Sequence, residues 1–230
     1  MASEVSVEMK SAESISLRRE DIDQRFRVIW DNLIGGWAAL STWQVVTEAV
    51  NEDRLDGHSW LLQSVVISCR HEAIMALARI FDPRDRRHDH ASLSALLDLV
   101  AQNPEVFVHA PTRESVIEVV EDKKKWIKEH NLAGRIRRIR NKVLAHSDLQ
   151  GVGDRQSVTA VWISMAEVEA CYEEVLEVVN VFQGHLKDCE WILGDIKPDV
   201  IDDFNRLFKA PLDAHAAWKA KRDARGALTP

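Results

Sequence analysis

Apolar residues recur at intervals of three and four along most of this sequence, which is the period of an α-helix. The first part of the chain shows the pattern at Trp30, Leu33, Trp37, Leu40 and Val45. Strand-like alternation is confined to residues 157–163 (SVTAVWI), which favours a short strand or an extended loop. The sequence therefore predicts an all-α fold, an up-down helical bundle with extra helices at its C-terminal end.

Caps and turn formers set the expected helix ends. We expect helices over residues 20–50, 59–81, 93–102, 112–130, 132–146, 164–187 and 198–210. The segments 112–130 and 132–146 are either two helices or one kinked helix. Ser164 and Glu167 have the spacing of a capping box, in which each side chain satisfies a backbone N–H of the other residue.

Three regions follow from this pattern. Residues 1–19 are expected to be a flexible N-terminal segment, because their apolar residues show no period. Residues 20–190 form the main helical domain, and residues 191–230 form a helical extension whose tail, from about Lys221, is expected to be disordered. A chain of 230 residues fits one large domain with such appendages.

The cysteines and the apolar runs indicate a cytoplasmic protein. Cys69, Cys171 and Cys189 are scattered, and each sits in an apolar helical pattern, so we interpret them as reduced core residues. The first ten residues, MASEVSVEMK, lack the apolar core of a signal peptide. No run reaches about 18 uninterrupted apolar residues, so we expect no membrane span.

Positive charge is concentrated in one stretch of an otherwise acidic chain. The net charge is -7, yet residues 123–142 hold nine basic residues and one acidic residue, Glu129. Such a concentration is the usual electrostatic footprint of a phosphate-bearing partner. The alternative is a solvated helix face whose basic side chains pair with acidic neighbours.

A histidine ends the apolar stripe that follows this basic stretch. Leu132, Ile136, Ile139 and Val143 recur at helical spacing, and His146 occupies the next position. A histidine near a helix C-terminus is commonly there because the helix dipole favours it. Arg140 and Asn141 lie within two turns of His146, which suggests a chemical role instead.

These three residue types suit RNA cleavage by the 2′-hydroxyl of the RNA itself. Histidine can transfer protons at neutral pH, arginine presents a fork of donors that matches phosphate oxygens, and asparagine adds a neutral hydrogen bond. On a straight helix Arg140 and His146 point about 120° apart and lie about 9 Å apart along the axis. Two copies packed across a two-fold axis can bring both pairs to one groove.

The same residues resemble a known family. RNKVLAH (residues 140–146) is similar to the R-x(4–6)-H signature of the HEPN superfamily. CRHEAIMALARIFDPRDRRHDHASLSALL (residues 69–97) resembles the AbiU-type abortive-infection branch of that superfamily. The resemblance implies an up-down helical bundle, a homodimer, and metal-independent endoribonuclease activity in bacterial defence or a toxin–antitoxin system. Residue by residue, the signature transfers to Arg140, Asn141 and His146.

The leading hypothesis is therefore an RNase of the HEPN type that needs no cofactor and no metal. The residues expected to guide RNA phosphates are Arg137, Arg138, Lys142, Lys124 and Lys125. The histidine pair in HDH (residues 88–90) lies beside two arginines, whose charge opposes metal binding. The alternatives are a non-catalytic helical module that binds protein or RNA, and an antitoxin-like subunit; a cognate antitoxin is a possible partner of the enzyme.

Overall fold

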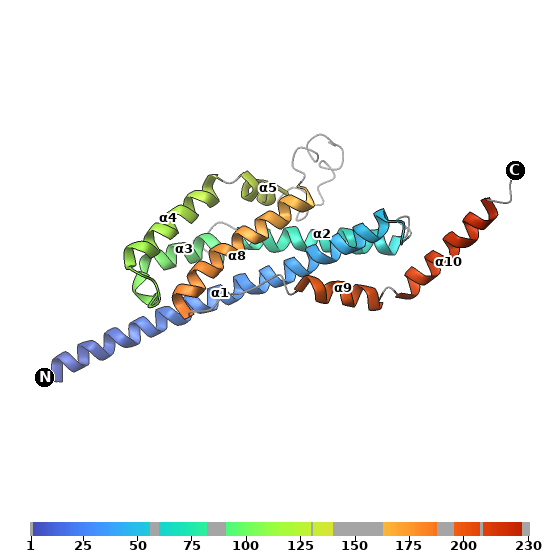
Figure 1. Cartoon of the computed structure of the whole chain (residues 1–230). Coiled ribbons are helices and arrows are strands. Elements are labelled where there is room, and N and C mark those ends of the chain that lie inside the picture. The colour runs from blue at the N-terminus through green and yellow to red at the C-terminus, as the bar shows by residue number, and fades with distance from the viewer. Residues whose placement is uncertain are drawn as a thin grey trace. The chain divides into compact units, whose positions relative to one another are not determined.

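The chain is described by a computed structural model, which covers residues 2–55, 60–81, 91–129, 131–139, 163–187, 196–207 and 209–226 (Figure 1). The helices are α1 (Ala2–Asn51), α2 (Trp60–Ile80), α3 (Leu93–Gln102), the 3-10 turn η1 (Pro104–Val106), α4 (Arg113–Glu129), α5 (Asn131–Ile139), α8 (Met165–Lys187), α9 (Ile196–Leu207) and α10 (Lys209–Gly226). No strand occurs among these residues, so the predicted all-α fold is confirmed. The SVTAVWI segment lies outside the described residues, apart from the buried Ile163.

Most helix ends agree with the caps and prolines that predicted them. The capping box of α8 is formed: Ser164 N donates to Glu167 Oε2 over 2.8 Å, and Glu167 N donates to Ser164 Oγ over 3.2 Å. Thr112 Oγ1 accepts the N–H of Ser115 over 3.1 Å at the start of α4. The segments 112–130 and 132–146 contain two helices, α4 and α5.

The ends of the chain are more helical than expected. α1 begins at Ala2 rather than near residue 20, and α10 (Lys209–Gly226) was not among the expected helices, since we expected a helix to end before Pro211 and disorder from about Lys221. Residues 2–19 hold eight alanine, glutamate, lysine or arginine residues, and residues 221–226 hold four alanine, lysine or arginine residues, all of them strong helix formers. The prediction relied on apolar periodicity, which these two stretches do not show. α9 and α10 each carry a proline, Pro198 and Pro211, in the first turn, where it disrupts no helical hydrogen bond.

The described residues form two compact units. The first contains residues 1–34 and 74–191, and the second contains residues 35–73 and 192–230. α1 and α2 therefore contribute residues to both units. The expected division of the chain at residues 190 and 191 stays a prediction.

α8 is the central helix of the first unit. Its buried side chains recur at helical spacing: Val168, Cys171, Tyr172, Val175, Val178, Val179, Phe182 and Leu186. The ring of Phe182 lies 6.5 Å from that of Phe26 on α1 and 5.9 Å from that of Phe107 after η1. Lys187 pairs with Asp23, so α8 runs antiparallel to α1, as an up-down bundle requires.

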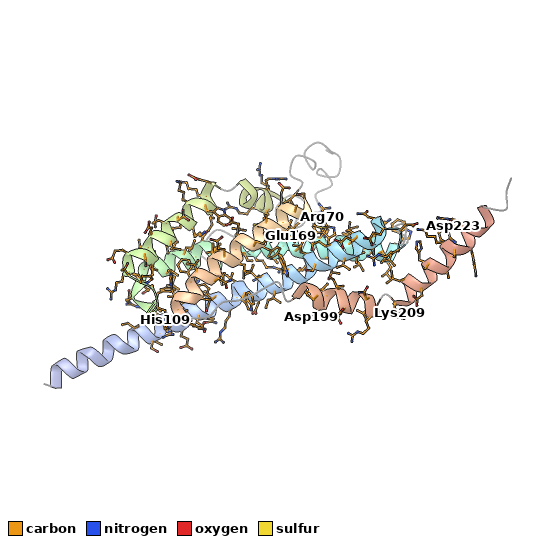
Figure 2. All side chains as sticks on the ribbon, in the orientation of Figure 1. Arg70, His109, Glu169, Asp199, Lys209 and Asp223 are labelled. Carbon is orange, nitrogen blue, oxygen red and sulfur yellow. The ribbon has the colours of Figure 1, made fainter. Side chains whose placement is uncertain are left out.

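Backbone and ring contacts place α3 and α4 in the same unit. The backbone N–H of His109, labelled in Figure 2, donates to the carbonyl of His185 at the end of α8 over 3.0 Å. The ring of Trp126 on α4 lies 5.9 Å from that of Phe81 at the end of α2. Ser92 caps α3 by accepting the N–H of Ala95 over 3.3 Å. These contacts join the segment before α4 to the end of α8 and pack α4 against the end of α2; α5 follows directly from α4 in the chain.

The second unit has its own small core. Val45, Val46, Ala49, Leu55 and Leu62 form a buried cluster, and Leu212 of α10 packs against it. Asp53, which has a φ of 54°, accepts the ammonium of Lys219 at 2.5 Å and faces Nε2 of His215 at 3.4 Å. Both partners lie on α10, and they lower the pKa of the Asp53 carboxyl, Lys219 more than His215. Beside the cluster, an apolar groove of about 340 Å³ is lined by Thr47, Val50, Leu62, Gln63, Val66 and Ile67.

By length and composition, α2 is apolar enough to cross a membrane, the one such helix in the described part of the chain. This is weak evidence, because a core helix passes the same test. Arg70, labelled in Figure 2, and Glu72 lie in the middle of α2, where charges are costly in lipid. The guanidinium of Arg70 stands 5.7 Å from the ring centroid of Trp43 on α1, and Ala73, Ile74, Ala76, Leu77, Ala78 and Ile80 are buried. The C-terminal half of α2 is therefore packed within protein, whereas Trp60, Leu61 and Ile67 in its first half are exposed.

Candidate functional site

The segment with the candidate catalytic residues begins directly after the last residue of α5 in the sequence. Arg140, Asn141 and His146, together with Lys142, lie outside the described residues, which resume at Ile163. Ile136 of α5 is fully buried, as the predicted stripe requires. The described part of the site is therefore its base, where α5 leads into residues 140–162 and α8 begins after them.

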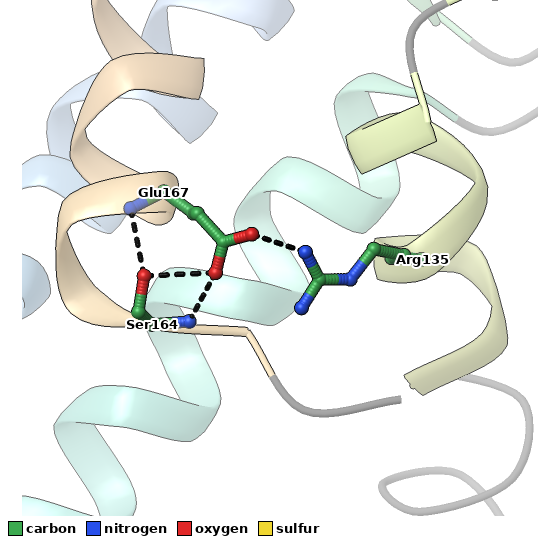
Figure 3. Close-up of polar contacts among 3 residues, drawn as sticks. All are labelled: Arg135, Ser164 and Glu167. Atoms are coloured by element: carbon green, nitrogen blue, oxygen red, sulfur yellow. Dashed lines mark hydrogen bonds and ion pairs between the residues drawn. The ribbon is translucent and has the colours of Figure 1, made fainter. Parts of the chain in front are cut away.

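An ion pair joins α5 to α8 at this base. Arg135 Nη1 donates to Glu167 Oε1, while Oε2 of the same carboxylate accepts the N–H and the hydroxyl of Ser164, each over 2.8 Å (Figure 3). Glu167 thus caps α8 with one oxygen and binds α5 with the other. The sequence does not predict the contact with Arg135, because no spacing rule connects residues 32 positions apart.

Hydrogen bonding holds the Glu167 carboxylate in its charged form. The backbone N–H of Ser164 is the largest cause, followed by the Ser164 hydroxyl and by Arg135, and together they lower the pKa of Glu167. The Glu167 side chain is 40% exposed, so solvent screens its attraction to Arg135. The geometry of the contact therefore matters more here than its strength.

Several of the basic residues in the 123–142 stretch have acidic partners. Lys123 Nζ lies 3.2 Å from Glu177 Oε1 on α8, and Lys124 Nζ lies 3.1 Å from Asp98 Oδ1 on α3. With Arg135 paired to Glu167, three basic side chains serve packing between helices. Neighbouring acids thus neutralise part of the positive charge that the sequence concentrates here.

Other basic residues of the stretch face solvent. Lys125 and Arg138, two of the predicted RNA contacts, are exposed, as is Lys128. Arg138 donates Nε–H to the carbonyl of Gly134 within its own helix over 3.4 Å, which leaves its charge uncompensated by that contact. Arg137 is half-buried and takes part in an interaction of its own. The outward-facing charge on α4 and α5 therefore centres on Lys125, Lys128 and Arg138.

Metal ligands and reactive thiols do not gather in the described residues. No group of three or more His, Cys, Asp or Glu side chains in that part of the chain has the geometry to hold a metal ion. Cys171 is buried, and burial raises the pKa of its thiol, as it does for the half-buried Cys69. His88, His90 and Cys189 lie outside the described residues.

Comparison with known proteins identifies the family. The family model of AbiU2, a HEPN family, matches residues 19–207, which is most of the chain. This chain belongs to the AbiU2 family. The resemblance seen in the sequence to the AbiU-type branch of the HEPN superfamily is thereby confirmed. No significant match was found among curated proteins or among solved structures.

The AbiU2 match covers both the candidate signature and its base. Residues 140–146 lie within it, and so do Arg135, Ser164 and Glu167. The match ends at residue 207, the last residue of α9, so α10 lies wholly beyond it. α10 is thus an addition to the part of the chain that the family model describes.

Proposed function

We propose that this AbiU2-family protein is an endoribonuclease that cleaves RNA through attack of the RNA 2′-hydroxyl and needs no metal ion. The observation that carries the proposal is the family match over residues 19–207, which includes the candidate signature Arg140–His146 within a HEPN-type helical fold. Membership in the family gives the fold. The activity rests on the chemistry of the signature residues.

Each signature residue has a distinct task in that reaction. His146 transfers a proton between the attacking 2′-hydroxyl and the leaving 5′-oxygen, because an imidazole titrates near neutral pH. Arg140 binds the non-bridging phosphate oxygens, where negative charge grows in the transition state. Asn141 orients the substrate or the histidine by a neutral hydrogen bond. The cleaved strand then carries a 2′,3′-cyclic phosphate and a 5′-hydroxyl.

Two copies of the chain form the active groove in this proposal. On a straight helix Arg140 and His146 would point about 120° apart, so these two side chains would not meet within one chain. A two-fold contact presents every residue of the seam twice, so each Arg140 can meet the partner subunit's His146. The biological setting that fits is bacterial defence or a toxin–antitoxin system in the cytoplasm, with a cognate antitoxin as inhibitor.

RNA approaches along the outward-facing cations. Lys125 and Arg138 are exposed on α4 and α5, whereas Lys124 is already paired with Asp98. Phosphate contacts of this kind supply affinity that is independent of sequence and falls with salt. We assign the larger share of that affinity to Lys125 and Arg138, together with Lys142 and Arg137 nearer the signature.

The test compares His146→Ala with the wild-type protein in single-turnover cleavage of a labelled RNA. We expect cleavage to persist in excess EDTA, and His146→Ala to lower the rate about 10²- to 10⁴-fold. His109→Ala is the matched control, because His109 is an exposed histidine on another part of the same unit. The proposal would be contradicted if His146→Ala cleaved RNA at the wild-type rate. It would also be contradicted if the products carried 3′-hydroxyl ends and formed only in the presence of magnesium.

A second candidate function is a non-catalytic helical module that binds RNA or protein, including an antitoxin-like subunit. The ion pairs of Lys123, Lys124 and Arg135 with acidic residues favour it, since they use basic charge for packing. This candidate predicts no RNase activity, and it predicts that His146→Ala lowers the melting temperature or dissociates the dimer. Thermal melts and cleavage assays on the same proteins therefore separate the two functions.

A further inference from the structure

We propose that the Arg135–Glu167 ion pair is a positioning contact, which sets where Arg140 and Asn141 stand relative to α8. The proposal rests on the proposed function, because it gives those two residues a chemical task. Neither Arg135 nor Glu167 touches substrate in this assignment. They act through the backbone of α5.

In the chain, Arg135 and Glu167 lie on either side of residues 140–162, which contain the signature. Arg140 follows the last residue of α5, Ile139, which is one turn and about 6 Å beyond Arg135 along the helix axis. On the other side, Ile163 directly precedes Ser164, whose backbone and hydroxyl bind Glu167. Arg135 and Glu167 therefore tie together the two described ends that flank residues 140–162.

α5 depends on such a contact for its placement. It has nine residues, and isolated helices shorter than about 12–15 residues are marginal in water. Among the α5 side chains whose burial is described, Ile136 is the fully buried one, and burial fixes a position without fixing a direction. The adjacent Arg135 adds a directional hydrogen bond to α8, which contributes to the orientation of α5.

The capping box prepares Glu167 for this task. Oε2 is already held by the backbone and hydroxyl of Ser164, so the carboxylate is fixed before Arg135 binds Oε1 (Figure 3). An exposed ion pair normally loses side-chain entropy when it forms. Here the Glu167 side chain has already lost much of its freedom by forming the cap. A fixed acceptor gives Arg135 one preferred direction, which an acceptor on a freely rotating side chain would not.

Glu167→Gln separates the positioning contact from the cap. Glutamine serves at this position of a capping box as glutamate does, so α8 keeps its N-terminal cap while Arg135 loses the negative charge of Glu167. Removing a negative charge beside the basic stretch does not weaken RNA binding electrostatically. Glu177→Gln is the matched control, because it removes the same charge from the same helix and breaks the 3.2 Å pair with Lys123.

We expect Glu167→Gln to lower the single-turnover cleavage rate at saturating RNA by about 10- to 100-fold, the scale at which misplaced catalytic groups act. The Kd for RNA should stay the same or fall, and the melting temperature should match that of Glu177→Gln. Glu177→Gln should cleave at the wild-type rate. Arg135→Lys, which keeps a cation that reaches Glu167, should cleave faster than Arg135→Met.

A double-mutant cycle completes the test. If the two residues act as one contact, Arg135→Met combined with Glu167→Gln should cleave no more slowly than the slower single variant. Wild-type rates in Glu167→Gln, or rate losses in Glu167→Gln and Glu177→Gln that are equal, would overturn the proposal. Independent, multiplying losses in the double variant would overturn it too.

Amide hydrogen exchange tests the contact without any chemistry. If the wild-type protein cleaves no RNA, the proposed enzyme is wrong, and exchange over residues 136–142 then decides whether the contact orders this part of the chain. Faster exchange there in Glu167→Gln than in Glu177→Gln would support the positioning contact. Equal exchange in the two variants would overturn it.

Discussion

Lys124 and Asp98 join α4 to α3 through an ion pair of 3.1 Å between Nζ and Oδ1. Lys124 also lies 3.6 Å from Glu121 on its own helix, whereas the next residue, Lys125, is exposed. Adjacent lysines in one sequence run are therefore in different electrostatic surroundings. This difference bears directly on which of them binds RNA phosphates.

Lys125→Ala should weaken RNA binding more than Lys124→Ala. The charge of Lys124 is already compensated by Asp98, whereas removing a phosphate-binding charge at Lys125 should flatten the slope of log affinity against log salt by about 0.7 for single-stranded RNA. Binding titrations over a range of salt concentrations, made in the His146→Ala background, measure both quantities. A steeper loss of affinity for Lys124→Ala would show that the Asp98 pair opens when RNA binds.

Arg140→Lys should retain RNA binding and lose much of the cleavage rate. A lysine ammonium keeps the charge but cannot reproduce the two parallel hydrogen bonds of a guanidinium to phosphate. The decrease in rate should reach up to about 10²-fold at saturating RNA, comparable to that of a misplaced catalytic group. Equal rates for Arg140→Lys and the wild type would show that the guanidinium of Arg140 does not stabilise the transition state.

The active protein should be a dimer of twice the chain mass of 26.2 kDa. The sequence predicts that Arg140 and His146 would diverge on a straight helix, and the proposed groove therefore needs a second copy. Light scattering at micromolar concentration measures the mass. Mixing inactive Arg140→Ala and His146→Ala proteins should restore some cleavage, because a mixed dimer contains one complete groove. A fully active monomer would contradict the proposed dimer.

Phe182→Ala should destabilise the first unit by about 3–5 kcal/mol. The ring is fully buried and packs against Phe26 and Phe107, so its removal leaves a cavity among three helical segments. Ile117→Ala, at a position 41% exposed on α4, is the control and should change stability by less than about 0.5 kcal/mol. Denaturant unfolding measures both free energies.

The contribution of Glu167 should disappear in acid. Its pKa is lowered in the folded protein by Ser164 first and Arg135 later, so the charged form stabilises the fold above the ordinary value of 4.5. That stabilisation is lost as the pH falls through the lower pKa of the folded state. The difference in Tm between the wild type and Glu167→Gln should therefore be constant above pH 4.5 and shrink below it. A difference that grows in acid would contradict the direction of the shift.

Apolar periodicity predicted the buried helices well. The capping box of Ser164 and Glu167 placed the start of α8, and the predicted range 164–187 agrees with Met165–Lys187. α1 before residue 20 and the helix α10 were not predicted. Those stretches are helical through residue propensity, which leaves no apolar period to read.

The candidate site was predicted in part. The signature at 140–146 was recognised from the sequence, and the family match supports that reading of the branch without testing the residues. The pairs that tie Lys123 to Glu177, Lys124 to Asp98 and Arg135 to Glu167 were not foreseen. Each joins residues far apart in the chain, and charge counted along a sequence does not show which cations meet an acid after folding.

The placement of α10 has a practical consequence. It begins beyond the AbiU2 match, so a chain trimmed at that boundary for crystallisation would lack it. Leu212 would leave the cluster formed by residues such as Val46 and Leu62, and Asp53 would lose its contacts with Lys219 and His215. The apolar cluster that Leu212 packs against would then meet water over a wider area. A trimmed protein would be prone to aggregate, and keeping the last helix is the safer choice for anyone who purifies it.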